Sequence, residues 1–133
     1  MPNAAICYRH FGPPEETLKL DPVALLPCPA DRLRVRMLCA PLNASDLIPV
    51  TGAYRHRITP PVVAGYEGVG VVISAPQSLR HRVGTRVLPL RSAGTWQHVV
   101  DCDPAWAIPV PDDIDTTLAA RAYINPLAAL LML

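Results

Sequence analysis

The sequence of 133 residues lacks an excess of charge of either sign, because 12 lysine and arginine residues are balanced by 11 aspartate and glutamate residues. A net charge of +1 argues against the strongly basic surface that nucleic acids and anionic membranes require. No apolar stretch is long enough to cross a bilayer, and the first residues lack the charged and apolar regions of a secretory signal. We therefore expect a cytoplasmic protein that has neither a nucleic acid nor a membrane as a partner.

Metal-binding and redox motifs are also missing. The four cysteines contain no Cys-x-x-Cys pair, and none of the four histidines has a cysteine or a second histidine at the spacing of metal ligands. These absences argue against a zinc ribbon, a helical zinc site and a dithiol redox site. We predict that no metal is bound and that the cysteines are free thiols in a reducing compartment.

What the sequence does contain is 16 prolines in a chain that is half hydrophobic. Proline interrupts helices and central strands, yet the apolar content is too high for disorder. We expect a turn at 11–16, a proline-bearing loop at 21–30, a helical turn at 47–50 and further helices only after residue 115. The pattern predicts a mainly β fold, a partly open β-barrel with short helices and a helical exit at the C-terminus. Strands are expected at 4–8, 17–20, 33–39, 69–73, 83–90, 95–100 and 105–110.

A glycine-rich segment, Gly65-Tyr66-Glu67-Gly68-Val69-Gly70, has some likeness to a nucleotide-binding loop. That loop requires a strand before the glycines and a helix after them. Here β-branched residues follow, so the segment is interpreted as a turn that enters a strand. Close backbone packing is the role expected for Gly68 and Gly70.

Three ordered sets of residues resemble the medium-chain dehydrogenase/reductase superfamily, and within it the zinc-independent 2-enoyl thioester reductases. The resemblance implies a GroES-like catalytic domain over residues 1–124. It further implies that residues 125–133 start a connecting helix toward a Rossmann domain, which we expect to be absent from this sequence. The sets are Pro41–Asp46 with Thr51–Tyr54, then Pro61–Val72, then Gly94–Gln97 with Ile108–Ile114, Asn125-Pro126 and Met132-Leu133.

By this resemblance, the reaction is the NADPH-dependent reduction of the double bond of a 2-enoyl thioester. Tyr54 matches the catalytic tyrosine of the branch, and a phenol is a neutral donor at pH 7. Asn125 matches a cofactor-contacting asparagine, and Asn43 is assigned to the same cofactor-binding cleft. Asn43 and Tyr66 occupy the metal-ligand positions of zinc-dependent members, and neither is a good zinc ligand there. The branch usually has Asn where Tyr66 stands and Thr where Ala128 stands.

Two alternatives remain open at this point. One is a quinone oxidoreductase of the same superfamily, and the other is a non-enzymatic GroES-like binding module. We expect the 133-residue chain by itself to have neither reductase activity nor affinity for NADPH, because it lacks the phosphate-binding glycines of a Rossmann domain. The apolar residues 127–133 have no partner in the sequence, so we also predict self-association through the C-terminal helix.

Overall fold

A computed structural model describes residues 2–92 and 94–133, whose strands form two antiparallel sheets. The first sheet has the order β2-β1-β4, with β1 (Asn3–Tyr8), β2 (Lys19–Val23) and β4 (Val62–Val63). The second has the order β7-β3-β5-β6-β8, with β3 (Leu33–Cys39), β5 (Val69–Ser74), β6 (Arg86–Pro89), β7 (Val99–Cys102) and β8 (Ala107–Pro109). The sheets do not close into a complete barrel, which confirms the mainly β, partly open fold.

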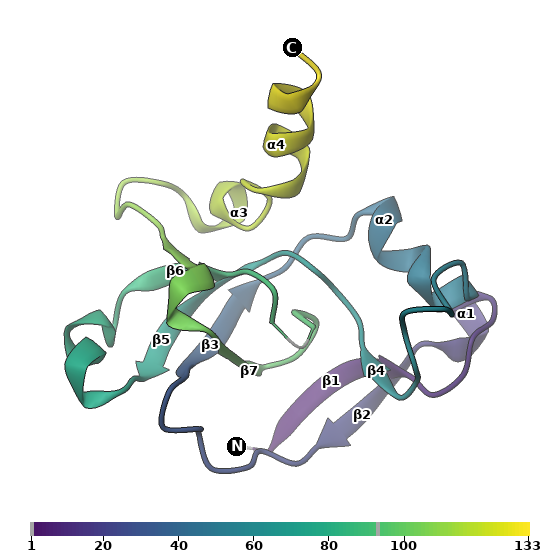
Figure 1. Ribbon diagram of the computed structural model, residues 1–133, viewed down its shortest axis with the longest axis horizontal. Coiled ribbons are helices and arrows are strands. Elements are labelled where there is room, and N and C mark those ends of the chain that lie inside the picture. The colour runs from purple at the N-terminus through teal and green to yellow at the C-terminus, as the bar shows by residue number, and fades with distance from the viewer. Residues whose placement is uncertain (1, 93) are drawn as a thin grey trace.

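The helices are short and lie outside the sheets (Figure 1). Figure 1 shows α4 projecting away from both sheets, with the C-terminus at its outer end. Within the part of the chain that the structure describes, no helix is long and apolar enough to span a membrane. The α-helices are α1 (Pro14–Thr17), α2 (Ala44–Leu47), α3 (Thr116–Ala119) and α4 (Ile124–Leu131), and the 3₁₀ turns are η1 (Pro49–Thr51), η2 (Gln77–Arg82) and η3 (Pro104–Trp106).

The sheet-edge strand β2 differs from its prediction. We expected a strand at 17–20 and a loop from residue 21, but β2 continues to Val23 and pairs with β1 from Cys7↔Lys19 to Asn3↔Val23. Proline 22 is tolerated because β2 is an edge strand, where a missing backbone N–H costs no ladder bond. The expected turn at 11–16 likewise contains the start of α1, which has Pro14 in its first turn.

Three other strands begin later in the chain than the sequence predicted. The strand expected at 83–90 begins at Arg86, because the preceding residues form a turn in which Thr85 donates its backbone N–H to the Arg82 carbonyl over 3.0 Å. The strand expected at 95–100 begins at Val99, and the one expected at 105–110 begins at Ala107, after η3. The strand predicted at 33–39 is confirmed as β3.

One buried cluster draws its side chains from β3, β5, β6, β7 and β8, and close backbone contact at glycine lets neighbouring strands pack tightly. A Cβ atom on Gly70 would lie 2.5 Å from Val35 Cγ1 and 2.6 Å from the Arg36 carbonyl oxygen. A Cβ atom on Gly68 would lie 2.7 Å from Met37 Cε. The expectation of close packing at both glycines is confirmed. The buried cluster around them consists of Leu33, Val35, Val72, Val87, Val100, Cys102 and Ala107.

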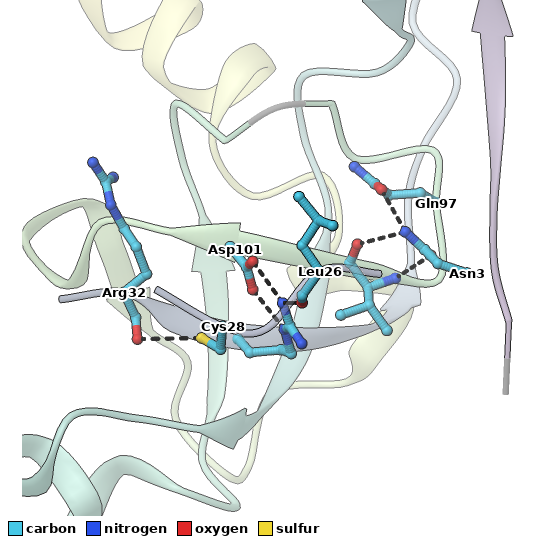
Figure 2. A network of polar contacts seen from close by, with 8 residues as sticks. Asn3, Leu26, Cys28, Arg32, Gln97 and Asp101 are labelled. Atoms are coloured by element: carbon cyan, nitrogen blue, oxygen red, sulfur yellow. Dashed lines mark hydrogen bonds and ion pairs between the residues drawn. The ribbon is translucent and has the colours of Figure 1, made fainter. Parts of the chain in front are cut away.

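Polar contacts join the two sheets along the segment that precedes β7 (Figure 2). The Ile6 N–H of β1 donates to the Trp96 carbonyl over 2.8 Å. Asn3, which is buried, donates from Nδ2 to Gln97 Oε1 over 2.9 Å and accepts from the Val99 N–H over 3.1 Å. The first sheet is therefore fastened to the second at the N-terminal strand.

Loop 24–32 is held against β3 and β7 by Arg34, whose partners Leu26 and Asp101 are labelled in Figure 2. Its guanidinium makes two hydrogen bonds of 2.8 Å to the carboxylate of Asp101 on β7. A third bond of 2.6 Å reaches the Leu26 carbonyl. These charge-assisted bonds satisfy the mostly buried guanidinium. The arrangement therefore has a structural role, because it holds the loop against the sheet.

Candidate active site

Residues from five separate segments surround an open hollow of about 620 Å³. The hollow lies where α2, η1, the turn after η1 and the loop before β5 meet the first residue of α4. Its lining mixes two phenols, one guanidinium and apolar walls, a combination suited to a small ligand that carries a polar oxygen. The lining residues are Ser45, Pro49, Tyr54, Arg57, Ile58, Tyr66 and Ile124.

The buried carboxylate of Asp46 holds two of these segments together. Its Oδ2 accepts the backbone N–H of Asn43 over 2.7 Å, at the start of α2, and its Oδ1 accepts the backbone N–H of Tyr66 over 3.2 Å. Burial raises the pKa of Asp46, and the two backbone donors partly offset that effect. Asp46 thus positions the Tyr66 backbone relative to α2.

Tyr54 is presented by a tight turn after η1. Gly52 ends η1 with φ of +91°, a left-handed conformation that glycine adopts without strain. The Tyr54 carbonyl then accepts the N–H groups of Arg57 and Ile58 over 2.9 and 3.0 Å. The Arg57 guanidinium lies 5.2 Å from the centroid of the Tyr54 ring. The turn therefore places a phenol and a cation side by side at the hollow.

Glu67 connects the site to helix α4, a role that the sequence did not reveal. Its side chain is only 2% exposed. Its Oε1 accepts the backbone N–H groups of Tyr123 and Ile124 over 2.8 and 2.9 Å, at the positive end of α4. Its Oε2 accepts Asn43 Nδ2 over 3.1 Å. One carboxylate therefore fixes both the start of α4 and the amide of Asn43.

The three residues predicted for the site lie in different surroundings. Tyr54 lines the hollow and is 37% exposed. Asn125 is exposed in the first turn of α4, directly after the lining residue Ile124. Asn43 is half-buried and reaches Glu67 behind the hollow. The roles assigned to these residues remain predictions.

Replacing Glu67 by Ala should loosen α4 from the domain. The change leaves two backbone N–H groups without their acceptor, and an unsatisfied buried donor costs about 1–3 kcal/mol. We expect a loss of that size in the free energy of unfolding, together with faster hydrogen exchange at Tyr123 and Ile124. Glu67→Gln keeps an acceptor oxygen and should lose less. Glu16, which is exposed, offers a control as Glu16→Ala. If Glu67→Ala and Glu16→Ala have the same free energy of unfolding, the bonds from Glu67 to α4 contribute little to stability.

Residues 29–112 match the family model of the alcohol dehydrogenase GroES-like domain. This match covers more than half of the chain, so the chain belongs to that family. Its superfamily is the medium-chain dehydrogenases and reductases.

Similarity to individual proteins points to two kinds of reductase. The mitochondrial enoyl-[acyl-carrier-protein] reductase of Arabidopsis thaliana is 34% identical over 135 residues, which covers 99% of this chain and 36% of that protein. The crystal structure of a candidate NADPH:quinone reductase from Bacillus thuringiensis superposes with a TM-score of 0.95 at 44% identity, over 99% of this chain and 40% of that one.

A more distant structure shares the fold. It is a mitochondrial 2-enoyl thioester reductase of Candida tropicalis, whose complex with NADP and crotonyl-CoA gives a TM-score of 0.85 at 22% identity. The match covers 100% of this chain and 43% of that chain. The present chain thus spans well under half the length of each of the three proteins.

Proposed function

We propose that this chain forms the catalytic portion of an NADPH-dependent reductase that acts on a carbon–carbon double bond conjugated to a carbonyl, with a 2-enoyl thioester as the first candidate substrate. The observation that carries the proposal is the Tyr54 phenol, which faces an open hollow bounded by the first residue of α4. The enoyl reductases among the relatives support the choice of substrate. Residues 1–124 are proposed as the catalytic domain and 125–133 as a connecting segment.

The chain's own residues supply binding and charge stabilisation. In such a reduction, bound NADPH supplies the hydride that forms the new C–H bond at the β-carbon and is left as NADP⁺. The double bond breaks, negative charge gathers on the carbonyl oxygen, and a proton then adds to the α-carbon. We propose that the Tyr54 hydroxyl donates to that oxygen or delivers that proton, and that the nearby Arg57 cation favours the developing charge.

Asn125 and Asn43 are the residues proposed to contact NADPH. Asn125 is exposed beside the hollow, and within the described ranges its amide makes no hydrogen bond, so it is free to meet a ligand. Asn43 donates its Nδ2 group to Glu67 and shares a capping box with Asp46 at the start of α2, so it is proposed to contribute a firmly positioned neutral amide. In both cases the residue would contact NADPH through an uncharged amide group.

We also propose that the site works without zinc. The Asn43 amide donates to Glu67. By the resemblance to zinc-dependent members, Tyr66 occupies the position of a ligating histidine. Elemental analysis of untagged protein dialysed against zinc should find far less than one zinc per chain. The double variant Asn43→Cys with Tyr66→His restores two ligand types and should retain more zinc. Stoichiometric zinc in the unsubstituted protein would contradict the proposal.

A quinone oxidoreductase is the second candidate, favoured by the 44% identity to the quinone reductase candidate. The deciding experiment uses this chain joined to a nucleotide-binding domain, called the joined protein below. NADPH oxidation is measured with a crotonyl thioester and with a small quinone. Oxidation with neither substrate would instead support a non-enzymatic GroES-like binding module.

The proposed cytoplasmic location is tested by cell fractionation, since the curated relatives are named as mitochondrial.

A further inference from the structure

Two phenols face the same hollow from separate segments of the chain. Tyr54 comes from the turn after η1, and Tyr66 comes from the loop that leads into β5. Tyr66 as a residue is 47% exposed, although its backbone N–H is fixed by the bond to Asp46. Tyr66 is therefore held in position with its ring open to a ligand.

Neither phenol hydroxyl is occupied by the part of the protein that the structure describes. Among the residues that the structure describes, no side chain or carbonyl makes a hydrogen bond with the hydroxyl of Tyr54 or Tyr66. Burial raises the pKa of Tyr66, and the negative charge of Asp46 and the neighbouring Tyr54 raise it further. Tyr66 thus stays protonated as a neutral donor across the physiological range.

The remaining lining defines what these donors can receive. Pro49, Ile58 and Ile124 are apolar, Ser45 adds one hydroxyl, and Arg57 adds a positive charge beside Tyr54. A ligand that suits this lining has an apolar, flat body and an electron-rich oxygen. It carries no positive charge of its own, because Arg57 would repel it.

We infer that Tyr66 is a specificity-determining residue that acts with Tyr54 to bind the carbonyl oxygen of a compact, planar, conjugated ring ketone of the quinone type. This inference rests on the proposed reductase function and selects between its two candidate substrates. A ring ketone presents its oxygen at the tip of a flat body, where two donors can reach its two lone pairs while apolar walls and phenol rings cover its faces. A thioester carbonyl can also accept two donors, but its flexible chains give the apolar walls and the phenol rings no flat ring to cover.

The corresponding reduction is balanced by NADPH and one proton. The quinone accepts a hydride from NADPH, and the carbonyl oxygen held by the phenols takes a proton from one of them, which water then reprotonates. The products are a hydroquinone and NADP⁺. Tyr66 is needed here for holding the ring ketone, and the inference therefore concerns selectivity more than rate.

The binding test uses ¹⁵N-labelled 133-residue chain and two soluble ligands that do not add to thiols. These are 2,6-dimethyl-4-pyranone, a planar conjugated ring ketone, and the saturated thioester S-butyryl-N-acetylcysteamine. The pyranone should shift the amide signals of Tyr66 and Ile124. Tyr66→Phe should weaken its binding about three- to tenfold, as expected for one hydrogen bond. Thioester binding should change less than about twofold.

Tyr123→Phe is the matched control, because Tyr123 is a similarly exposed phenol that is not part of the lining. It should alter neither titration. The inference is overturned if the pyranone does not shift Tyr66 in the unsubstituted chain, or if Tyr66→Phe weakens both ligands equally. In the joined protein, Tyr66→Phe should lower duroquinone reduction relative to crotonyl thioester reduction. An unchanged ratio would refute the selectivity role alone, whereas absence of NADPH oxidation with both substrates would refute the reductase function.

Discussion

Replacing Tyr54 by Phe in the joined protein should lower turnover about 10²–10⁴-fold, the contribution typical of a positioned general acid. The physical reason is that phenylalanine keeps the ring and its packing beside Arg57 but removes the proton that the reaction needs. Steady-state turnover with the better of the two candidate substrates measures the loss. Fluorescence titration should give an NADPH affinity close to that of the unsubstituted protein.

The same substitution should leave the fold intact. The Tyr54 hydroxyl makes no hydrogen bond to another described residue, so its removal leaves no protein group unsatisfied. Thermal unfolding of Tyr54→Phe should therefore match that of the control Tyr123→Phe. Turnover that is unchanged in Tyr54→Phe would mean that Tyr54 is a loop residue, and equal losses in both variants would point to a general effect of removing a surface phenol.

Local sequence pattern was sufficient where one strand carries its own alternation. Strand β3 was predicted with its observed bounds because Leu33, Val35 and Met37 alternate with two arginines. Strand β2 was misplaced because its pairing with β1 overrides the presence of Pro22. Strand pairing is a contact between distant residues, and it decides the limits of an edge strand that has no clear pattern of its own.

The candidate site shows the same difference between what local sequence indicates and what contacts between distant residues decide. Tyr54 was singled out by its resemblance to the catalytic tyrosine of the reductases, and in the structure it lines the hollow. The bonds from Glu67 to Tyr123 and Ile124 join residues 56 and 57 positions apart, and no periodicity encodes them. The importance of Tyr66 likewise depends on a hollow assembled from several segments. The resemblance therefore singled out Tyr54, whose role remains a prediction, but it gave no indication of the contacts of Glu67 or of the hollow that Tyr66 helps to line.

Helix α4 combines a firmly held start with an uncovered end. Glu67 fixes its first turn, whereas no residue of Ile124–Leu131 is buried. Leu130 and Leu131 are 66% and 77% exposed, and Met132 and Leu133 are more exposed still. A contiguous apolar surface of this kind on a rigidly oriented helix favours association, since soluble monomers seldom leave such a patch uncovered.

We therefore expect the 133-residue chain to self-associate through α4, and the double variant Leu130→Glu with Leu131→Glu to be monomeric. Two buried carboxylates would oppose the contact by their desolvation cost, which exceeds what a surface ion pair returns. Sedimentation equilibrium at several concentrations measures the effect. The control is Leu20→Glu with Leu26→Glu, which adds the same charge at leucines that are 73% and 72% exposed elsewhere. If the control also dissociates the chain, net charge and not α4 governs association. If the unsubstituted chain sediments as a monomer, its apolar helix end does not drive association.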